Sequence, residues 1–313
     1  MTDRLYHLDA WRSTAYDAVI VGGGPAGLSA ALVLGRANKR VLIVDDNRPA
    51  NAVSDGVGGL LGHDRVKPAD LRERGRRQLE EHANVEIRPG AVAGVERIRD
   101  AFVVTPADGS PVRTHAIVLA HGLRYEPPAL PGIDALWGRS VFHCAFCDGW
   151  EVRDRPLAFR GSGPGAARSA LVLAGWSNDV VLCTDGAPDP GGAVLEAAGV
   201  RVRTEPIAWL AGNDGRLERI EFTRGEAERR EALFVETRRD QPNGLAAALG
   251  CELTEAGTIV TDADGRTNVA GVYAAGDAAT AHSRSVANAI GMGSRVAYAV
   301  ALERVASTFA VAA

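Results

Sequence analysis

A glycine-rich turn between two apolar strands is the feature that most constrains how this chain can fold. Asp17–Val21 is apolar after its first residue, which is typical of a strand buried in a parallel sheet. It leads directly into a GxGxxG turn at residues 22–27, and Leu28–Ala37 then has helical composition. A second strand, Arg40–Val44, ends at an acidic residue, Asp45. This order of strand, glycine turn, helix, strand and acid predicts a site for a dinucleotide.

The glycines and the acid of this unit each have a structural role in binding a dinucleotide. Gly22 permits the tight turn, Gly24 lets the backbone approach a pyrophosphate, and Gly27 lets the helix pack closely on the strand. The helix N-terminus offers free N–H groups to phosphate oxygens, and Asp45 can accept a hydrogen bond from a ribose hydroxyl.

A second unit of the same kind begins near the middle of the chain. Arg155–Arg160 is a short candidate strand, and Gly161-x-Gly163-x-x-Ala166 follows it, about 139 residues after the first glycine turn. Ala167–Gly175 has helical composition, and Val180–Cys183 is the next apolar run. Near the C-terminus, Gly271–Asp277 predicts a strand that ends in Gly-Asp, and a helix is expected from about Ser285 to Arg304. Alternating strands and helices favour an α/β fold with two Rossmann-like, doubly wound, three-layer domains.

Length, charge and the chain's start narrow the function classes. A chain of 313 residues suggests about two domains, and a net charge of −4 disfavours a nucleic-acid binder. The segment Met1–Asp9 has acidic residues and no apolar core, so we expect no signal peptide and a cytoplasmic protein. Ala18–Gly35 is uncharged and almost long enough to span a membrane, but its glycines and proline favour the buried strand, turn and helix instead.

The four cysteines predict one redox or metal pair. Cys144 and Cys147 are three positions apart, whereas Cys183 and Cys251 stand alone. A structural zinc site needs four ligands, and no second CxxC motif is present, so redox chemistry is favoured over zinc. A purely structural disulfide is the remaining alternative.

With these motifs in hand, the chain resembles the low-molecular-weight thioredoxin reductase family of flavoproteins over nearly its whole length. The matching pieces are Val21–Gly27, Leu119–Gly122, His143–Gly149 and Thr267–Asp277. The resemblance implies an FAD-binding domain at residues 1–123 and 246–313, interrupted by a smaller pyridine-nucleotide-like domain at 124–245. It also implies a homodimer. The residues that the resemblance and the glycine motif assign to FAD are Gly22, Gly24, Pro25, Ala26, Gly27, Asp45, Asn51, Gly276, Asp277, Ser285 and Val286.

In this family the first cysteine of the pair exchanges with the substrate and the second faces the flavin. The resemblance therefore implies that Cys144 is the interchange thiol and Cys147 the flavin-facing thiol. Asp148 resembles the family's acid–base carboxylate, which needs a raised pKa, although a plain turn residue before Gly149 is the alternative. His143 either relays a proton or is only a histidine at the end of a strand.

The second glycine turn departs from the NADPH-dependent reductases. Those enzymes carry arginines after the following strand that bind the 2′-phosphate. Here Asp185 and Asp189 lie in that stretch, and both would repel a phosphate. Arg160 replaces an apolar residue in the preceding strand and could fill or deform the pyrophosphate pocket. We therefore expect no NADPH site, although Asp185 could still accept a hydrogen bond from the free ribose of NADH.

A flavoprotein with a CxxC pair and a degraded nicotinamide site resembles the dithiol oxidases of natural-product pathways, the gliotoxin and holomycin type. The segments His143–Glu151 and Asn51–Asp64 are similar to theirs. That resemblance implies an enzyme that forms a disulfide in a small-molecule dithiol, with O₂ as the final acceptor giving H₂O₂. The alternatives are a thioredoxin reductase fed by NAD(P)H or ferredoxin, and a redox-silent FAD-binding sensor.

Three further features have two interpretations each. The loop Asp55–Gly59 either lies over the flavin beside a substrate pocket or is a flexible connection. The four arginines within Arg72–Arg77 are interpreted as a solvated helix face rather than a binding patch. His121 stands where the family usually has threonine and is interpreted as structural.

Overall fold

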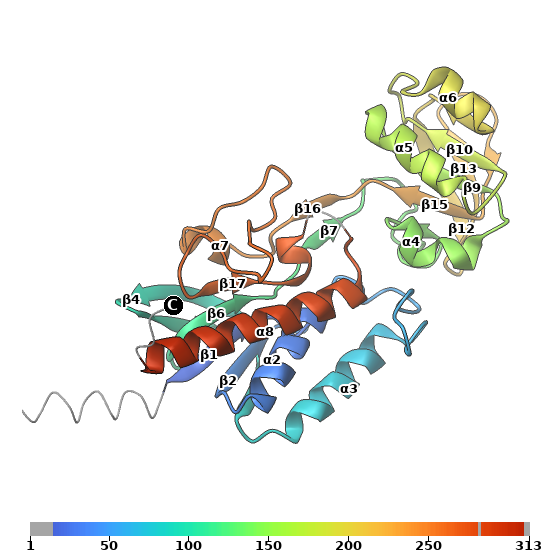
Figure 1. Ribbon diagram of the computed structural model, residues 1–313. Coiled ribbons are helices and arrows are strands. Elements are labelled where there is room, and N and C mark those ends of the chain that lie inside the picture. Colours follow the sequence, from blue (N-terminus) through green and yellow to red (C-terminus); the bar gives the residue numbers. More distant parts are fainter. Residues whose placement is uncertain (1–14, 281–282, 310–313) are drawn as a thin grey trace, which may run out of the picture. The chain divides into compact units, whose positions relative to one another are not determined.

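The computed structural model describes residues 15–280 and 283–309, and these divide into two compact units (Figure 1). The first unit holds the described residues of 1–52, 69–124 and 239–313, and the second holds 53–68 and 125–238. The expected boundaries, after 123 and before 246, differ from this division by a few residues. The larger difference is segment 53–68, which the sequence assigned to the first domain and which clusters with the second unit.

The first unit is built on a seven-stranded sheet with its helices packed against it. The strand order is β3 (Val85–Pro89), β2 (Val41–Asp45), β1 (Tyr16–Val21), β6 (Val112–Leu119), β5 (Ala101–Pro106) and β4 (Val92–Ile98), with β17 (Val272–Ala274) paired to β6. Strands β3, β2, β1, β6 and β17 run parallel, while β4 and β5 are antiparallel to their neighbours. The helical elements are α2 (Pro25–Arg36), α3 (Pro68–Glu80), α7 (Leu245–Ala248), η2 (Gly276–Ala279) and α8 (Val286–Phe309).

Helices α2 and α8 lie side by side in the first unit (Figure 1). Small residues allow this close approach, because a Cβ at Gly293 of α8 would overlap the backbone of Ala26 in α2. Beneath them, Ile20, Ile43 and Val118 of the central strands are fully buried and form one apolar cluster with Leu34. A core of this kind is what the uninterrupted apolar strands predicted.

The second unit has a smaller parallel sheet of the same type. Its order is β11 (Val200–Arg203), β10 (Val180–Cys183), β9 (Leu157–Arg160), β15 (Ala232–Val235) and β8 (Val141–Phe142). A three-stranded antiparallel sheet follows, made of β12 (Ile207–Asn213), β13 (Arg216–Phe222) and β14 (Glu228–Arg229). The helical elements are α4 (Ala145–Asp148), η1 (Gly149–Val152), α5 (Gly163–Leu173) and α6 (Gly192–Ala197). The short strands β7 (Arg124–Glu126) and β16 (Arg238–Asp240) pair where the chain passes between the units.

The predicted elements are confirmed, with shifts at the helix ends. Both helices after the glycine turns begin earlier than their composition suggested, α2 at Pro25 and α5 at Gly163, because a proline at the first or second helical position favours helix initiation. Within residues 15–280 and 283–309, no helix is both long and apolar enough to cross a membrane. The segment Met1–Asp9 lies outside the described residues.

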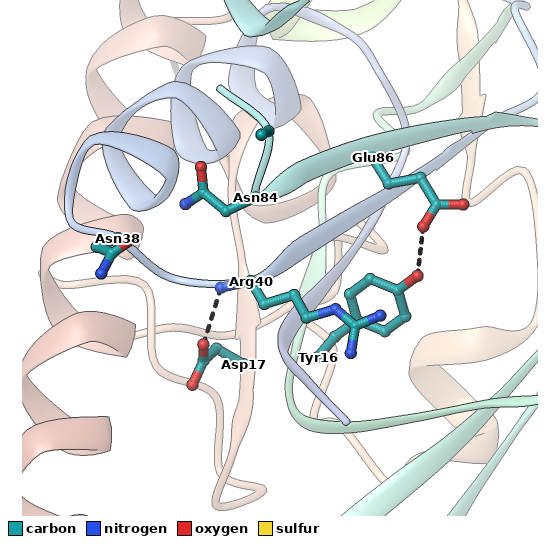
Figure 2. A pocket seen from close by; sticks show the side chains of 7 residues that line it. Tyr16, Asp17, Asn38, Arg40, Asn84 and Glu86 are labelled. Atoms are coloured by element: carbon teal, nitrogen blue, oxygen red, sulfur yellow. Dashed lines mark hydrogen bonds between the residues drawn. The ribbon is translucent and has the colours of Figure 1, made fainter. Parts of the chain in front are cut away.

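A hollow of about 400 Å³ lies at the amino end of the first unit's sheet, away from the glycine turn (Figure 2). Its polar groups satisfy one another: the Tyr16 hydroxyl donates to Glu86, the Arg40 N–H donates to Asp17 (2.8 Å), and the Arg40 guanidinium lies over the Tyr16 ring. Ligands of open α/β sheets bind at the carboxyl ends of the strands, so we assign this hollow a structural role.

Candidate functional site

The first glycine turn adopts the geometry that the motif requires. Gly22 has φ +102°, and a Cβ there would lie 2.6 Å from the carbonyl oxygen of Ala120. A Cβ at Gly27 would overlap the carbonyl oxygen of Gly22. The fold itself therefore requires glycine at both positions.

Gly24 differs from these two glycines, because a Cβ there would meet nothing within 4 Å. Its φ of −75° is open to any residue, so neither packing nor backbone strain explains a glycine here. The Asp45 carboxylate lies beside the same turn, since a Cβ at Gly23 would approach its Oδ2 to 2.5 Å. The space over Gly24 and the Asp45 carboxylate thus lie at the same turn.

Asp45 is buried and already paired within the chain. Its Oδ2 accepts a hydrogen bond from Nη2 of Arg76 at 2.6 Å, and its Oδ1 accepts from the Asn47 N–H at 3.2 Å. Arg72 donates to the side-chain oxygen of Asn47 at 2.7 Å. The interpretation of these helix arginines as a solvated face is therefore wrong for Arg72 and Arg76. They point inward because α3 packs beside the end of β2, which sequence spacing alone does not reveal.

Several buried polar atoms at this end of the first unit have no partner among the described residues. They are Nε of Arg72 and Arg76 and Nε2 of His121, whose backbone lies against Gly22. Burial lowers the pKa of His121, so its ring is held neutral. Buried polar atoms without partners are rare, and a bound ligand or water satisfies them. Together with the open space over Gly24 and the Asp45 carboxylate, the residues present fit the pyrophosphate and ribose of FAD.

The C-terminal residues predicted to touch FAD lie in the same unit. A Cβ at Gly276 would come within 3.1 Å of the Ala26 Cβ, so the start of η2, including Asp277, lies beside the glycine turn. Ser285 is the N-cap of α8, because its Oγ accepts the Asn288 N–H at 3.1 Å. Val286 is the first residue of that helix, and Asn51 lies half-buried in a turn after β2. Their expected flavin contacts remain predictions.

In the second unit, Cys144 and Cys147 form a disulfide with their Cα atoms 5.3 Å apart. Cys144 lies just before the short helix α4, which follows β8, and both cysteines are half-buried. The other two cysteines, Cys183 and Cys251, are buried and free. The two sulfurs are bonded to each other, which is the oxidised form that a thiolate attacks in thiol–disulfide exchange.

Segment 53–68 packs directly on this disulfide turn. A Cβ at Gly58 would overlap the Cys147 carbonyl oxygen, and Nε of Arg65 lies 3.3 Å from Oε1 of Glu151. The segment is also closed on itself, with Val57 and Val66 bridged and the Gly59 N–H donating to Asp64 at 2.8 Å. The loop Asp55–Gly59 thus packs against the backbone of Cys147, and its place over the flavin stays a prediction.

Asp148, the residue after the second cysteine, has the perturbed carboxyl that acid–base chemistry needs. Burial is the largest cause that raises its pKa, to about 7, and the nearby anions Glu151 and Asp55 raise it further. The Arg65 guanidinium opposes them. Asp148, Asp55, Arg65 and Glu151 all line a hollow of about 910 Å³ within the second unit, which connects this carboxyl with solvent. A carboxyl that titrates near neutral pH can both accept and release a proton.

His143 is exposed and lies among aromatic rings. Its ring centroid is 4.6 Å from that of Tyr125 and 6.0 Å from that of Trp137. These contacts fix the orientation of its ring just before Cys144. They leave both the proton relay and the structural interpretation open.

The second glycine turn has an acidic side chain of its own unit beside it. Glu236, at the end of β15, lies against it, because a Cβ at Gly161 would come within 2.7 Å of the Glu236 carboxyl carbon. Arg160 does not fill the turn. Its Nε and Nη2 instead bind Oδ2 of Asp185 at 3.2 and 2.8 Å.

The other oxygen of Asp185 accepts the Ile207 N–H at 2.8 Å. Both carboxylate oxygens of Asp185 are thus engaged within the chain, and its role as a ribose acceptor stays a prediction. Asp189 accepts the N–H groups of Gly191 and Gly192 and stabilises the loop before α6. Three carboxylates, those of Asp185, Asp189 and Glu236, thus lie in the part of this unit that follows the second glycine motif. The phosphates of a dinucleotide bind to hydrogen-bond donors rather than to carboxylates.

Comparison with known proteins now identifies the family. The family model described as pyridine nucleotide-disulphide oxidoreductase matches residues 16–293. The chain belongs to this family. It has the α/β thioredoxin reductase fold with two nucleotide-binding domains, and it is a thioredoxin reductase-like flavin thiol–disulfide oxidoreductase. Members of this family typically bind FAD.

The individual relatives agree with this assignment. The chain is 32% identical over 279 residues to the thioredoxin reductase tcpT of Claviceps purpurea, covering 85% of this chain and 87% of that protein. The crystal structure of HlmI matches with a TM-score of 0.85 and 37% identity, covering 95% of this chain and 98% of the other. An oxidoreductase structure from Agrobacterium tumefaciens matches with a TM-score of 0.86 and 32% identity, covering 93% and 99%.

Sequence reasoning missed several residues that shape both sites. None of these residues belongs to a recognisable motif, and each contacts a partner at least 30 positions away. The pairs are Glu236 with Gly161, Arg76 with Asp45, and Arg65 with Glu151. Only Glu236 had a local signal, since it directly follows the apolar run Ala232–Val235. The carboxyl end of a buried strand is where a parallel sheet brings ligand-binding residues together.

Proposed function

We propose that this protein is an FAD-dependent dithiol oxidase. In this proposal it forms an intramolecular disulfide in a small-molecule dithiol of a natural-product pathway, through Cys144 and Cys147. The net reaction is dithiol plus O₂ giving disulfide plus H₂O₂, in which two electrons and two protons pass from the substrate to oxygen.

The observation that carries the proposal is the second glycine turn. The Glu236 carboxylate beside Gly161 repels a pyrophosphate, and the Arg160–Asp185 pair uses the groups that could otherwise bind a ribose. At an effective dielectric constant near 20, two unit charges 4 Å apart repel by about 4 kcal/mol, and solvent around the exposed Glu236 reduces this. In this proposal NAD(P)H does not bind, so the electrons come from the thiol substrate.

The chemistry of the cysteine pair follows from thiol–disulfide exchange. A substrate thiolate attacks the sulfur of Cys144, the Cys144–Cys147 bond breaks, and Cys147 leaves as a thiolate. The second substrate thiolate then attacks the substrate sulfur of this mixed disulfide, which releases the product disulfide and the Cys144 thiolate. Both cysteines are half-buried rather than fully enclosed, which favours such an attack from solvent.

In this proposal Asp148 is the general base that accepts the proton of the substrate thiol. In its carboxylate form it accepts a proton from a substrate thiol, and with a pKa near 7 it is available in that form at neutral pH. Glu151 and Arg65, which lie on the same hollow, set how readily it does so and give the proton a route to solvent.

The first unit would hold FAD through the open backbone at Gly24, the Asp45 carboxylate and the residues at the start of η2. Bound FAD would supply a two-electron acceptor that returns the reduced cysteine pair to the disulfide. A homodimer fits the exposed apolar side chains of Tyr298, Leu302 and Val305, which share one face of α8.

The deciding experiment measures O₂ consumption by the purified flavoprotein in the presence of dithiothreitol, and separately flavin bleaching by NADPH and NADH under argon. We expect O₂ uptake with stoichiometric H₂O₂, and no bleaching by either nucleotide. Cys144→Ser and Cys147→Ser abolish the uptake, whereas Cys251→Ser, a cysteine outside the site, retains it. Rapid bleaching by NADPH without dithiol-dependent O₂ uptake would overturn the proposal.

The second candidate is a thioredoxin reductase that takes electrons from NAD(P)H or ferredoxin and reduces a protein disulfide. It is favoured by Asp148, which follows the cysteine pair as in the reductases, and by the similarity to the thioredoxin reductase tcpT. Reduction of thioredoxin by either donor, measured as free thiol released, would support this candidate.

A further inference from the structure

Two large aromatic side chains are exposed beside the disulfide. Phe146 lies between the two cysteines and is 80% exposed, and Trp150 lies one helical turn later and is 65% exposed. Solvent-exposed rings of this size cost free energy unless something covers them. Phe146 is two residues after Cys144 in the disulfide turn, so a ligand that contacts its ring lies near the disulfide.

Both rings are held in place by neighbouring groups. Phe146 meets Trp176 edge to face with ring centroids 5.4 Å apart, and Gly149 allows Trp176 to approach, since a Cβ there would lie 3.0 Å from the indole ring. The Arg153 guanidinium lies over Trp150 at 3.9 Å from the ring centroid, and it also donates to the Trp150 carbonyl at 2.7 Å. Rings fixed in this way bind a flat partner at little cost in side-chain entropy.

The exposed area suits a small molecule rather than a protein. A fully exposed aromatic side chain offers about 150–250 Å², so these two rings offer roughly 300 Å² together. A stable protein–protein interface needs about 800 Å² on each partner. Small-molecule sites, by contrast, are lined mainly by apolar and aromatic side chains with a few polar groups.

We propose that Phe146 and Trp150 form a platform for the aromatic or heteroaromatic body of a small dithiol whose thiols react at Cys144. A substrate ring that stacks on Phe146 would lie over the disulfide turn. The Arg153 guanidinium beside Trp150 favours a ring that is electron-rich. This inference rests on the proposed oxidase function and names its substrate class. The two residues are specificity determinants, because the exchange chemistry itself needs only the sulfurs and Asp148.

The test compares two dithiols of similar reactivity, 1,2-benzenedimethanethiol and dithiothreitol, by O₂ uptake over a range of concentrations. The wild type is expected to have a KM at least tenfold lower for the aromatic dithiol. Phe146→Ala raises that KM about tenfold and leaves both kcat and the dithiothreitol kinetics within twofold of wild type. Phe146→Tyr retains the preference, and Trp150→Ala loses part of it. The matched control is Trp209→Ala, an exposed tryptophan in β12 rather than in the disulfide turn.

The outcomes separate the platform from the oxidase proposal. No O₂ uptake by the wild type with either dithiol overturns the oxidase function. Uptake of both with equal KM, or a Phe146→Ala variant that slows dithiothreitol as much as the aromatic dithiol, overturns the platform alone. Retained flavin absorbance and a cooperative thermal transition show that each variant is folded, and a second substitution, Phe146→Leu, gives an independent measurement if Phe146→Ala does not fold.

Discussion

Arg160 and Asp185 form a two-point ion pair at the carboxyl ends of the neighbouring strands β9 and β10, with Nε and Nη2 of the arginine 3.2 and 2.8 Å from Oδ2 of the aspartate. In a nucleotide-binding domain this edge of the sheet faces the ligand. Here the pair and the neighbouring Glu236 use that edge for contacts within the chain. The domain keeps the fold of a dinucleotide carrier, with an ion pair and a further carboxylate at this edge.

Removing the Glu236 carboxylate should restore part of a nucleotide site. Glu236→Ala eliminates the charge beside Gly161, so we expect ADP-ribose, a dinucleotide fragment without redox activity, to bind at least fivefold more tightly, which corresponds to about 1 kcal/mol. Isothermal titration calorimetry measures this directly. Glu221→Ala is the control, because Glu221 forms its ion pair with Arg219 on the same strand, β13. Equal affinities for ADP-ribose in the wild type and both variants would show that the Glu236 carboxylate does not weaken nucleotide binding at this turn.

The pH dependence of dithiol oxidation should report Asp148. Because Asp148 acts as a carboxylate, kcat/KM is expected to rise with pH through about 7, and Asp148→Asn should lower it about a hundredfold and remove that limb. Arg65 lowers the pKa of Asp148 and Glu151 raises it. Arg65→Ala should therefore move the limb to higher pH, and Glu151→Gln should move it to lower pH. Shifts in the same direction for both variants would contradict this assignment.

Two glycines of the first turn should respond to alanine in opposite ways. Gly27→Ala overlaps the Gly22 carbonyl and is expected to destabilise the fold by at least about 2 kcal/mol in urea unfolding. Gly24→Ala has room and a permissive backbone, so its apoprotein should unfold like the wild type. Its affinity for FAD, measured by flavin fluorescence quenching, should fall at least about tenfold because the backbone can no longer approach the pyrophosphate. Unchanged FAD affinity in Gly24→Ala would argue that the cofactor lies elsewhere.

The contact between segment 53–68 and the disulfide turn should matter for turnover. Gly58→Ala brings a methyl group into the Cys147 carbonyl, so the turn or the loop must move. We expect kcat for dithiol oxidation to fall about tenfold while FAD content stays unchanged, because a small misplacement of reacting groups is costly. Gly94→Ala in β4, where a Cβ meets nothing within 4 Å, serves as the control. A Gly58→Ala enzyme with wild-type kcat would show that the loop tolerates displacement without effect on the sulfurs.

The two glycine turns, the strands before them, the acid at Asp45 and the cysteine pair can all be read from the sequence alone. These features are local, since a buried strand, a tight turn and a CxxC spacing are each specified by neighbouring residues. The family assignment follows from the order of such local motifs, and the family model that spans residues 16–293 confirms it.

The surroundings of those motifs depend on how distant parts of the chain pack together. Glu236 reaches Gly161 because β15 is inserted beside β9, Arg76 reaches Asp45 because α3 packs beside β2, and Gly58 reaches Cys147 because segment 53–68 folds onto the second unit. The charge at a turn and the pKa of Asp148 depend on which distant side chains the packing brings within a few ångströms. Electrostatic and steric effects act through space rather than along the chain, and for that reason spacing in the sequence did not reveal them.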